Sequence, residues 1–365
     1  MQDSIKDDLI LFNQIVNEFL DDEKLNPISK KINIEDLSKK IDLSLGDSPT
    51  IKKEFADTLR KLILATPKSS SALFFNQLFG GRNSKAVIGD LLAVLLNNSM
   101  ATYKISGPQV GVEKEILFQV KNLIGYKENY GGTFPTGGSM SNFMSLIIAR
   151  DKKNLDIRNT GVNQKLIMYA SDNAHYSIAK NASFSGIGRD NVRYIKSNSF
   201  GCLDVKLLEE AINIDLKKGY TPFYINATAG TTVLGAFDNI KGISKISKKY
   251  KLWLHVDGAW GGAVLFSKSY NKLIAGVENS DSFCFNAHKS LGVPLSSSVL
   301  LVADKKDLYN SFSNEASYLY QTHDNDYNLG QTSFECGRRN NSLKLWTMWK
   351  AIGTSGISKV IDHQF

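Results

Sequence analysis

From about residue 165, short apolar runs alternate along the chain with helical patterns. The apolar runs predict buried strands, and the segments between them repeat their apolar residues with the period of a helix, as over 204–218 and 240–250. This alternation is typical of a mostly parallel sheet covered by helices on both faces. We therefore predict an α/β fold with strands at 166–169, 192–195, 223–226, 252–256, 283–285 and 299–302.

The first 70 residues show separate helical patterns instead. Between residues 5 and 20 the apolar side chains fall on one face of a helix, which needs a surface of its own domain or of a partner subunit. A second helix is predicted over 51–64, and the apolar segments 86–96 and 112–124 predict buried helices. We expect an N-terminal helical segment over 1–70, a large α/β domain over 71–341, and the start of a long helix over 342–365.

The composition of the chain limits the classes of protein to which it can belong. With 365 residues, 42% hydrophobic and 22% charged, the chain has the composition of a soluble globular protein. The net charge of +8 is spread without a dense basic run, and no segment is apolar enough to span a bilayer, so we expect neither a nucleic-acid nor a membrane partner. The three cysteines lack metal-ligand spacing, which indicates reduced thiols, no metal site and a cytoplasmic location.

Polar groups follow the predicted strands, where ligands of parallel sheets collect. The segment 135–142, Pro-Thr-Gly-Gly-Ser-Met-Ser-Asn, leads into a helix whose free N–H groups would suit a phosphate, although an ordinary capped helix start explains it equally well. His175 follows one strand, and the small, hydroxyl-rich turn 227–232 follows another. A lone loop histidine is by itself usually solvated.

Asp257 ends a strand apolar enough to be central. A buried carboxylate costs several kcal/mol unless a cation or a strong donor meets it, so a positive partner is expected. The next strand end supplies Lys289, beside Asn286 and His288. A phosphate cradle, a flat ring for stacking, a carboxylate and a lysine are together what a pyridoxal phosphate site requires.

In these motifs the chain resembles the group II pyridoxal-phosphate-dependent amino acid decarboxylases, and most of all their glutamate and cysteine sulfinate decarboxylase branch. The matching segments are 74–78, 137–139, His175, 228–232, 255–257, 286–289 and 336–339. The resemblance implies the fold of the type I pyridoxal-phosphate-dependent transferases. It also implies a homodimer that converts a small L-amino acid to an amine and carbon dioxide, with the acidic glutamate, aspartate and cysteine sulfinate among the candidate substrates.

The resemblance also assigns roles. Lys289 would hold the cofactor covalently, Asp257 would pair with the pyridine nitrogen, and His175 would stack on the ring opposite Ala259. The phosphate would lie among Gly138, Ser139, Met140, Ser141, Asn286 and His288. Thr232 would lie on the substrate side of the ring, Gln77 and Phe79 would border the substrate pocket, and Tyr327 would donate the proton to the product.

Two departures from the family pattern are mild, Ala287 in place of proline and Gly258 in place of alanine. A larger one is that family members continue for roughly a hundred residues as a small domain, a usual domain size, which we expect to be missing here. The alternative hypothesis is therefore a truncated, inactive relative that binds the cofactor and acts as a partner subunit or is a vestige. A third keeps the cofactor and changes the reaction to transamination, carbon–carbon lysis or oxidative deamination.

Overall fold

The computed structural model describes residues 5–29, 32–76, 78, 80–314 and 325–365. The chain forms two compact units, Met1–Gly81 and Arg82–Phe365. The first contains helices α1 (Ile5–Leu25), η1 (Ile34–Asp36), α2 (Leu37–Lys40) and α3 (Lys52–Ala65). Helices α1 and α3 pack against each other and line an apolar pocket of about 500 Å³. The predicted one-faced helix thus contacts a helix of its own unit.

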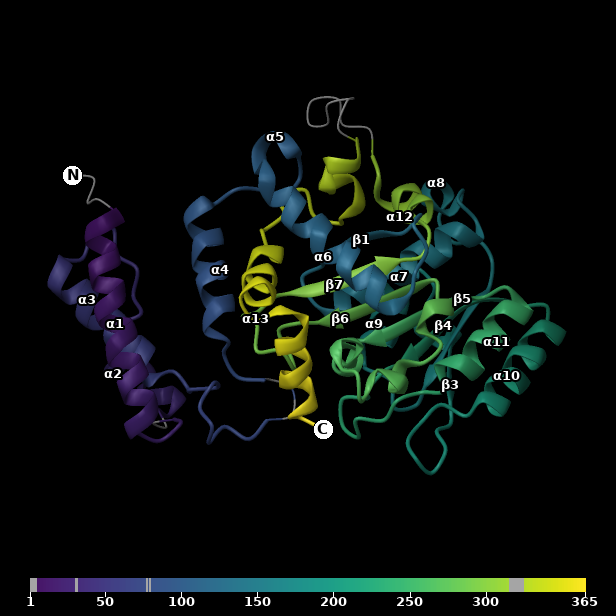
Figure 1. Cartoon of the computed structure of the whole chain (residues 1–365), viewed down its shortest axis with the longest axis horizontal. Coiled ribbons are helices and arrows are strands. Elements are labelled where there is room, and N and C mark those ends of the chain that lie inside the picture. The colour runs from purple at the N-terminus through teal and green to yellow at the C-terminus, as the bar shows by residue number, and fades with distance from the viewer. Residues whose placement is uncertain (1–4, 30–31, 77, 79, 315–324) are drawn as a thin grey trace. The chain divides into compact units, whose positions relative to one another are not determined.

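Within the described residues, one seven-stranded sheet forms the centre of the second unit (Figure 1). The strands are β1 (Gly131–Thr133), β2 (Leu166–Ser171), β3 (Val192–Ile195), β4 (Thr221–Thr228), β5 (Trp253–Gly258), β6 (Ser282–Asn286) and β7 (Ser298–Val302). Their order is β1-β7-β6-β5-β4-β2-β3, with β7 antiparallel to both neighbours and the other pairs parallel. The predicted, mostly parallel α/β sheet is confirmed.

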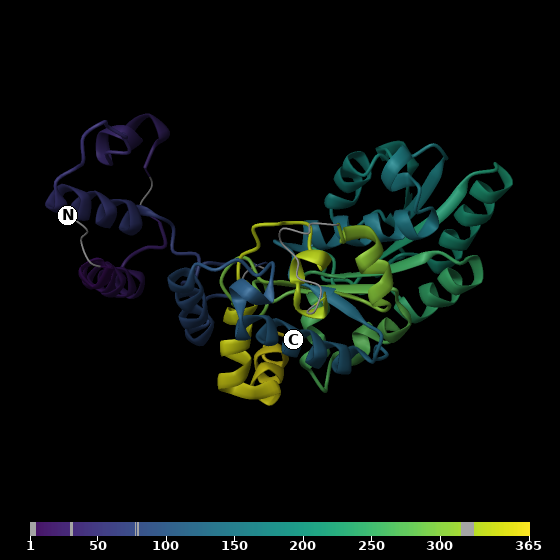
Figure 2. The same ribbon diagram turned by 90° about the horizontal axis from the view of Figure 1, so that it is seen from above.

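Helices cover both faces of this sheet (Figure 2). Alternate residues of β2 show why, since Ile167 and Tyr169 join one apolar cluster while Met168 and Ala170 join the other. On the first face lie α6 (Pro108–Ile124), α10 (Val205–Lys217), α11 (Ile240–Tyr250), η3 (Gly261–Phe266) and α13 (Ser342–Asp362). On the second lie α7 (Gly138–Lys153), α8 (Ile157–Thr160), α9 (Ser177–Phe184) and α12 (Lys305–Phe312). The remaining elements are α4 (Ser84–Leu96), α5 (Tyr103–Ser106), η2 (Arg189–Asn191), η4 (Asn271–Ile274), η5 (Val277–Asn279), η6 (Asn325–Tyr327) and η7 (Leu329–Thr332).

Helix α4 differs from its prediction as a buried helix. It packs on α13, beside which it lies in Figure 1, through a narrow face made of Ala86, Gly89 and Ala93. Six of its large apolar side chains are instead between 43% and 59% exposed, namely Ile88, Leu91, Leu92, Val94, Leu95 and Leu96. The sequence predicted a buried helix because the face that points away from α13 is also apolar. Among the described residues, nothing in the second unit covers that face.

The parallel strands bring their carboxyl ends to one edge of the sheet. The loops after β2, β4, β5 and β6 therefore meet there, and α7 crosses β4, β5, β6 and β7 on the second face. This edge is where the candidate site lies. Across the part of the chain that is described, no helix combines the length and the apolar character needed to cross a membrane.

Candidate active site

Asp257 lies at the end of β5 and is buried. Its Oδ1 accepts a hydrogen bond from the Ala259 amide at 3.0 Å, and its Oδ2 accepts one from Asn142 Nδ2 at 2.7 Å. The sequence predicted a cation as partner, whereas these close contacts are amide donors. Charge-assisted hydrogen bonds of this kind stabilise a buried anion, so the carboxylate can keep its charge and face a positively charged group of a ligand.

Lys289 follows β6 and is half-buried. Burial lowers its pKa below the ordinary value, and the nearby Asp257 opposes that shift. A lysine with a lowered pKa has more of its amine in the neutral, nucleophilic form. This side chain can therefore form a covalent bond to a carbonyl carbon.

His175 follows β2, and its Nδ1 lies 2.8 Å from Ser177 Oγ. Burial lowers the pKa of His175, the charge of Lys289 acts in the same direction, and Asp257 acts against both. The structure thus brings His175, Asp257 and Lys289 close enough to influence one another, as predicted from three separate strand ends. At neutral pH the ring is uncharged and can stack on a flat ligand.

Gly138 begins α7 with its backbone close to two predicted site residues. A Cβ on Gly138 would lie 2.8 Å from Ala259 Cβ and 3.0 Å from Asn286 Nδ2. No side chain caps the helix at Gly137, so the N–H groups of its first turn remain for a ligand. This helix start suits a phosphate, and only glycine at position 138 fits beside the Ala259 and Asn286 side chains.

The other predicted phosphate residues lie in the first turns of α7, at the end of β6 and in the loop after β6. Ser141 is buried with its Oγ 3.2 Å from the Gly137 carbonyl oxygen, Met140 is partly buried, and the Ser139 carbonyl accepts from Asn181 Nδ2 at 3.0 Å. Asn286 Oδ1 accepts from Ser298 Oγ at 2.7 Å, and the Ser297 amide lies 3.0 Å from His288 Nδ1. Burial lowers the pKa of His288 to about 4. His288 is therefore a neutral hydrogen-bonding group in the loop after β6.

Four predicted residues, Thr232, Gln77, Phe79 and Tyr327, lie outside this cluster or outside the described residues. Thr232 is half-buried in the loop after β4, next to Thr231, whose Oγ1 accepts from the Ala236 amide at 3.1 Å. Gln77 and Phe79 lie outside the described residues.

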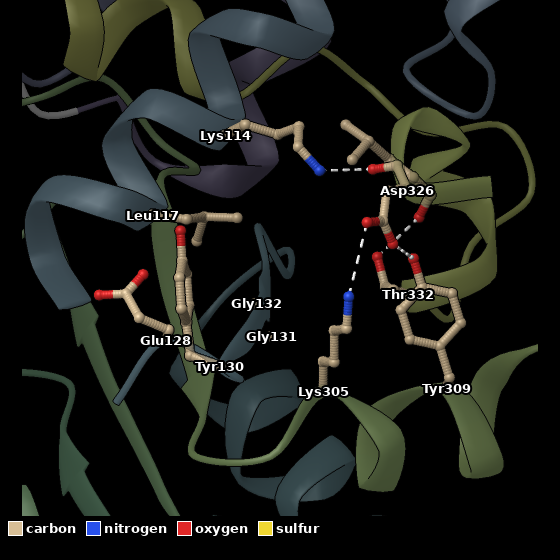
Figure 3. A pocket seen from close by; sticks show the side chains of 11 residues that line it. Lys114, Leu117, Glu128, Tyr130, Gly131, Gly132, Lys305, Tyr309, Asp326 and Thr332 are labelled. Atoms are coloured by element: carbon tan, nitrogen blue, oxygen red, sulfur yellow. Dashed lines mark hydrogen bonds and ion pairs between the residues drawn. The ribbon is translucent and has the colours of Figure 1, made fainter. Parts of the chain in front are cut away.

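Tyr327, in η6, contacts α5 and α6. Its ring meets that of Tyr103 edge to face at 5.7 Å, and Lys114 Nζ lies 4.6 Å from its centroid. The preceding Asp326 lies at a pocket of about 210 Å³, where Lys114, Lys305 and Tyr309 converge on it (Figure 3). Lys114 Nζ donates to the Asp326 carbonyl oxygen at 2.5 Å, and Lys305 Nζ lies 3.5 Å from Oδ2.

The pocket of Figure 3 is distinct from the cluster around Asp257. Gly131, in its lining, pairs with Val302, and Val302 pairs with Ser282, the first residue of β6. Strand β6 spans about 13 Å, and Lys289 lies three residues beyond its last residue, Asn286. Tyr327 is therefore attached through Asp326 to the end of the sheet opposite Lys289.

Three residues of the site were not assigned from the sequence, namely Asn142, Ser177 and His255. Asn142, in α7, contacts Asp257, Ser177 and His255. The signal that could have found His255 is a polar residue between apolar neighbours, since it lies between Leu254 and Val256 and is fully buried in β5. Asn142, which follows Ser141, carries no such signal.

The residues present fit pyridoxal phosphate. A glycine cradle without a Cβ suits its phosphate, a buried carboxylate held only by donors suits its ring nitrogen, and a lysine of lowered pKa suits its aldehyde. Each feature comes from a different strand end or helix start, so their meeting is a property of the fold.

Comparison with known proteins agrees with this chemistry. Residues 35–365 match the family model described as the pyridoxal-dependent decarboxylase conserved domain. The acidic amino acid decarboxylase GADL1 of Xenopus tropicalis is 36% identical over 97% of this chain and 70% of its own. Human cysteine sulfinic acid decarboxylase is 36% identical over 97% of this chain and 73% of its own. The crystal structure of mouse CSAD superposes with a TM-score of 0.93 at 33% identity, over 99% of this chain and 77% of its own.

The match covers the helical N-terminal unit in part and the whole of the second unit, where the cradle, the carboxylate and the lysine lie. The fold type I expectation and the resemblance stated from the motifs are both confirmed. The chain therefore belongs to the pyridoxal-dependent decarboxylase family, as an amino acid decarboxylase with pyridoxal phosphate as its cofactor.

Proposed function

We propose that the protein decarboxylates a small acidic L-amino acid, such as glutamate, aspartate or cysteine sulfinate, to an amine and carbon dioxide. The observation that carries this proposal is the meeting of Asp257, His175 and Lys289 beside the glycine cradle of α7. The acidic substrate is supported by relatives named as an acidic amino acid decarboxylase and a cysteine sulfinic acid decarboxylase.

Each side chain has a role that follows from its surroundings. Lys289 would hold the cofactor covalently through its amine, whose pKa burial lowers. Asp257 would keep a proton on the ring nitrogen, because two amide donors stabilise its negative charge. His175, uncharged at neutral pH, would stack on one ring face, and Ala259 would pack on the other. Bound pyridoxal phosphate supplies an electron sink for the pair of electrons left when carbon dioxide departs.

The phosphate would be held by the first turn of α7. Its N–H groups suit an anion, and the surrounding residues proposed for this task are Gly138, Ser139, Met140, Ser141, Asn286 and His288. Thr232 is proposed on the substrate side of the ring. Gln77 and Phe79 are proposed at the border of the substrate pocket.

Tyr327 is proposed as the proton donor to the product carbon. Its segment is held by Asp326 at the pocket of Figure 3, at the end of the sheet opposite Lys289. In this role the segment therefore has to leave its contacts with Tyr103 and Lys114 and move toward Lys289. A phenol that gives up a proton in the reaction must regain it from solvent, and the exposure of Tyr327 allows this.

The quaternary state proposed is a homodimer in the cytoplasm, without a nucleic-acid or membrane partner. The homodimer is supported by the exposed apolar side chains of α4, which a partner subunit would cover. The cytoplasm is supported by three free cysteines, which suit a reducing compartment. We also keep as a proposal the division of the chain into an N-terminal helical segment over 1–70, a large cofactor-binding domain over 71–341 and the start of a helix over 342–365.

The test is a screen of the common amino acids for carbon dioxide release, with the visible absorbance of bound cofactor recorded on the same sample. The expected result is release from one or more acidic amino acids. Lys289→Ala is expected to abolish both the absorbance band and the release, whereas the surface substitution Lys268→Ala is expected to preserve both, since Lys268 is exposed.

Three outcomes would contradict the proposal. Unchanged absorbance and unchanged release in Lys289→Ala would exclude Lys289 as the covalent anchor. A bound cofactor without release from any amino acid would favour an inactive partner subunit. An aldehyde product, identified by mass spectrometry, would indicate oxidative deamination.

A further inference from the structure

We propose that Asn142 is a positioning residue that holds both Asp257 and His175 in the orientations that the cofactor requires. The inference rests on the proposed function, because it takes these two side chains as the groups that contact the cofactor ring. Asn142 is buried in the first turns of α7. It would act through its neighbours, without contacting the substrate.

The first step concerns the orientation of the Asn142 amide. Its Nδ2 lies 2.7 Å from Asp257 Oδ2, and a carboxylate oxygen can only accept. The NH₂ group must therefore face Asp257, which leaves Oδ1 as an acceptor. His255 Nε2 lies 3.0 Å from that Oδ1, so Nε2 must carry a proton and donate.

The second step follows the protons through His255. Burial lowers the pKa of His255 to about 4, so the ring is neutral and a proton on Nε2 leaves Nδ1 as an acceptor. Ser282 Oγ lies 2.8 Å from Nδ1 and must donate to it, and Trp253 Nε1 donates to Ser282 Oγ at 2.9 Å. The donors thus point in one direction, from Trp253 through Ser282, His255 and Asn142 to Asp257. Such a chain polarises its last member toward the anion.

The third step concerns the second N–H of the amide. Asn142 Nδ2 also donates to Ser177 Oγ at 3.2 Å, so this hydroxyl is free to donate its own proton to His175 Nδ1 at 2.8 Å. The Ser177 amide donates to the same nitrogen at 3.2 Å. With Nδ1 accepting, the proton of neutral His175 is on Nε2.

Asn142 therefore uses both of its donors and its acceptor inside the protein. Besides Asp257, His255 and His175, the titratable neighbours are Cys284, whose Sγ lies 4.0 Å from Oδ1, and Lys289, whose charge acts on His175. An ionised carboxylate at position 142 could only accept. It would repel Asp257 and accept a hydrogen bond from the Ser177 hydroxyl, which would then no longer donate to His175 Nδ1, and the side chain is nearly the same size.

The test is ¹⁵N NMR of the histidine rings in the full chain, labelled at histidine, with and without pyridoxal phosphate. The wild-type protein is expected to show His175 and His255 neutral with the proton on Nε2. Ser177→Ala should move only the signals of His175, and Ser282→Ala only those of His255. Asn142→Asp should move both and weaken pyridoxal phosphate binding at least about tenfold, as expected when a buried carboxylate loses a donor.

The matched control is Asn129→Asp. Asn129 Nδ2 donates to Asp304 Oδ1 at 2.7 Å, the same amide-to-carboxylate contact on the exposed surface. This variant should leave the histidine signals and the cofactor affinity unchanged. The proposal is overturned if Asn142→Asp leaves the signals of either histidine or the cofactor affinity as in the wild type. If that variant does not fold, unchanged His175 signals in Ser177→Ala overturn it.

These readouts separate this inference from the proposed function. The histidine signals require no turnover, so they test Asn142 even in a chain that releases no carbon dioxide. Conversely, failure of the amino acid screen together with the expected histidine signals would contradict the proposed reaction and leave the arrangement around Asn142 standing.

Discussion

His255 and His288 are imidazoles kept uncharged by burial. Each has a pKa lowered to about 4, since burial disfavours the charged form. His255 is fully buried, so its shift belongs to the folded state. The unfolded chain exposes the same ring, which there has an ordinary pKa near 6.5. The protein therefore binds protons more readily once it unfolds.

The sign of the resulting pH dependence follows directly. Above pH ~6.5, His255 is neutral in both the folded and the unfolded state, and its contribution to stability is complete. As the pH falls toward ~4, His255 becomes protonated in the unfolded state only, which lowers the free energy of unfolding. Between pH ~7 and ~5, we expect the wild type to lose about 2 kcal/mol more unfolding free energy than His255→Gln. Urea unfolding at both pH values measures this.

A surface substitution of a residue that does not titrate, Ser199→Ala, is the control and should lose as much as the wild type. Equal losses in the wild type and His255→Gln would show that His255 titrates alike in both states. Asp238, whose pKa burial raises to about 6, acts in the opposite direction and is common to all three proteins.

At the residue scale, the sequence predicted the groups with distinctive chemistry. Lys289, Asp257 and His175 follow apolar strands and were found from that position. Asn142 was not assigned, because its contacts with Asp257 and His255 depend on where α7 crosses the sheet. More than a hundred residues separate the partners in sequence, and no local pattern records such a crossing.

At the scale of elements, α4 and α13 pack unusually closely. A Cβ on Gly89 would lie 2.7 Å from Lys344 Cα and 2.9 Å from the Leu343 carbonyl oxygen, which are backbone atoms. Lys344 is buried beside this contact, and its Nζ lies 3.2 Å from Asp90 Oδ1 and 3.3 Å from the Leu295 carbonyl oxygen. Because Leu295 follows Lys289 in the same loop, the helix pair supports the loop of the cofactor lysine.

Gly89→Ala is therefore expected to separate the two helices and to destabilise the protein by about 1–3 kcal/mol, as overpacking does. The matched substitution is Gly111→Ala in α6, where a Cβ meets nothing within 4 Å. That change should stabilise the protein by about 0.5–1 kcal/mol through helix propensity. Urea unfolding of both variants is the measurement, and equal effects of the two would contradict the close packing.

Elements with a clear period were predicted, and short ones were not. All six predicted strands form, and the helix predicted over 240–250 has the bounds Ile240–Tyr250. Strand β1 is only Gly131–Thr133, too short to show alternation. Helices α9 and α12 have eight residues each, little more than two turns, so their apolar residues do not establish a helical period.

At the scale of the whole molecule, one face of α4 is apolar and is not covered by any described residue of the second unit. Ile88, Leu91, Leu92 and Leu95 follow the spacing of one helix face and are all exposed. Contiguous apolar side chains of this kind mark a protein interface more often than a free surface. The face therefore supports contact between two copies of the chain.

Replacing Leu91 and Leu95 together by Glu is expected to halve the mass measured by analytical ultracentrifugation, because burying two charges costs several kcal/mol. Ile214→Glu is the control, since Ile214 is an exposed apolar residue on α10. It should leave the mass unchanged. A wild-type chain that sediments as a monomer, or a double variant that remains a dimer, would rule out α4 as the interface.

The arrangement around Asn142 also bears on how such a site can change over evolution. One amide serves a carboxylate and an imidazole at once, so selection acts on the two together. A library that varies the surroundings of Asp257 alone would disturb His175 whenever it alters position 142. New activities on this scaffold should therefore arise through the loops that border the substrate, or through paired changes that rebuild both hydrogen bonds in one step.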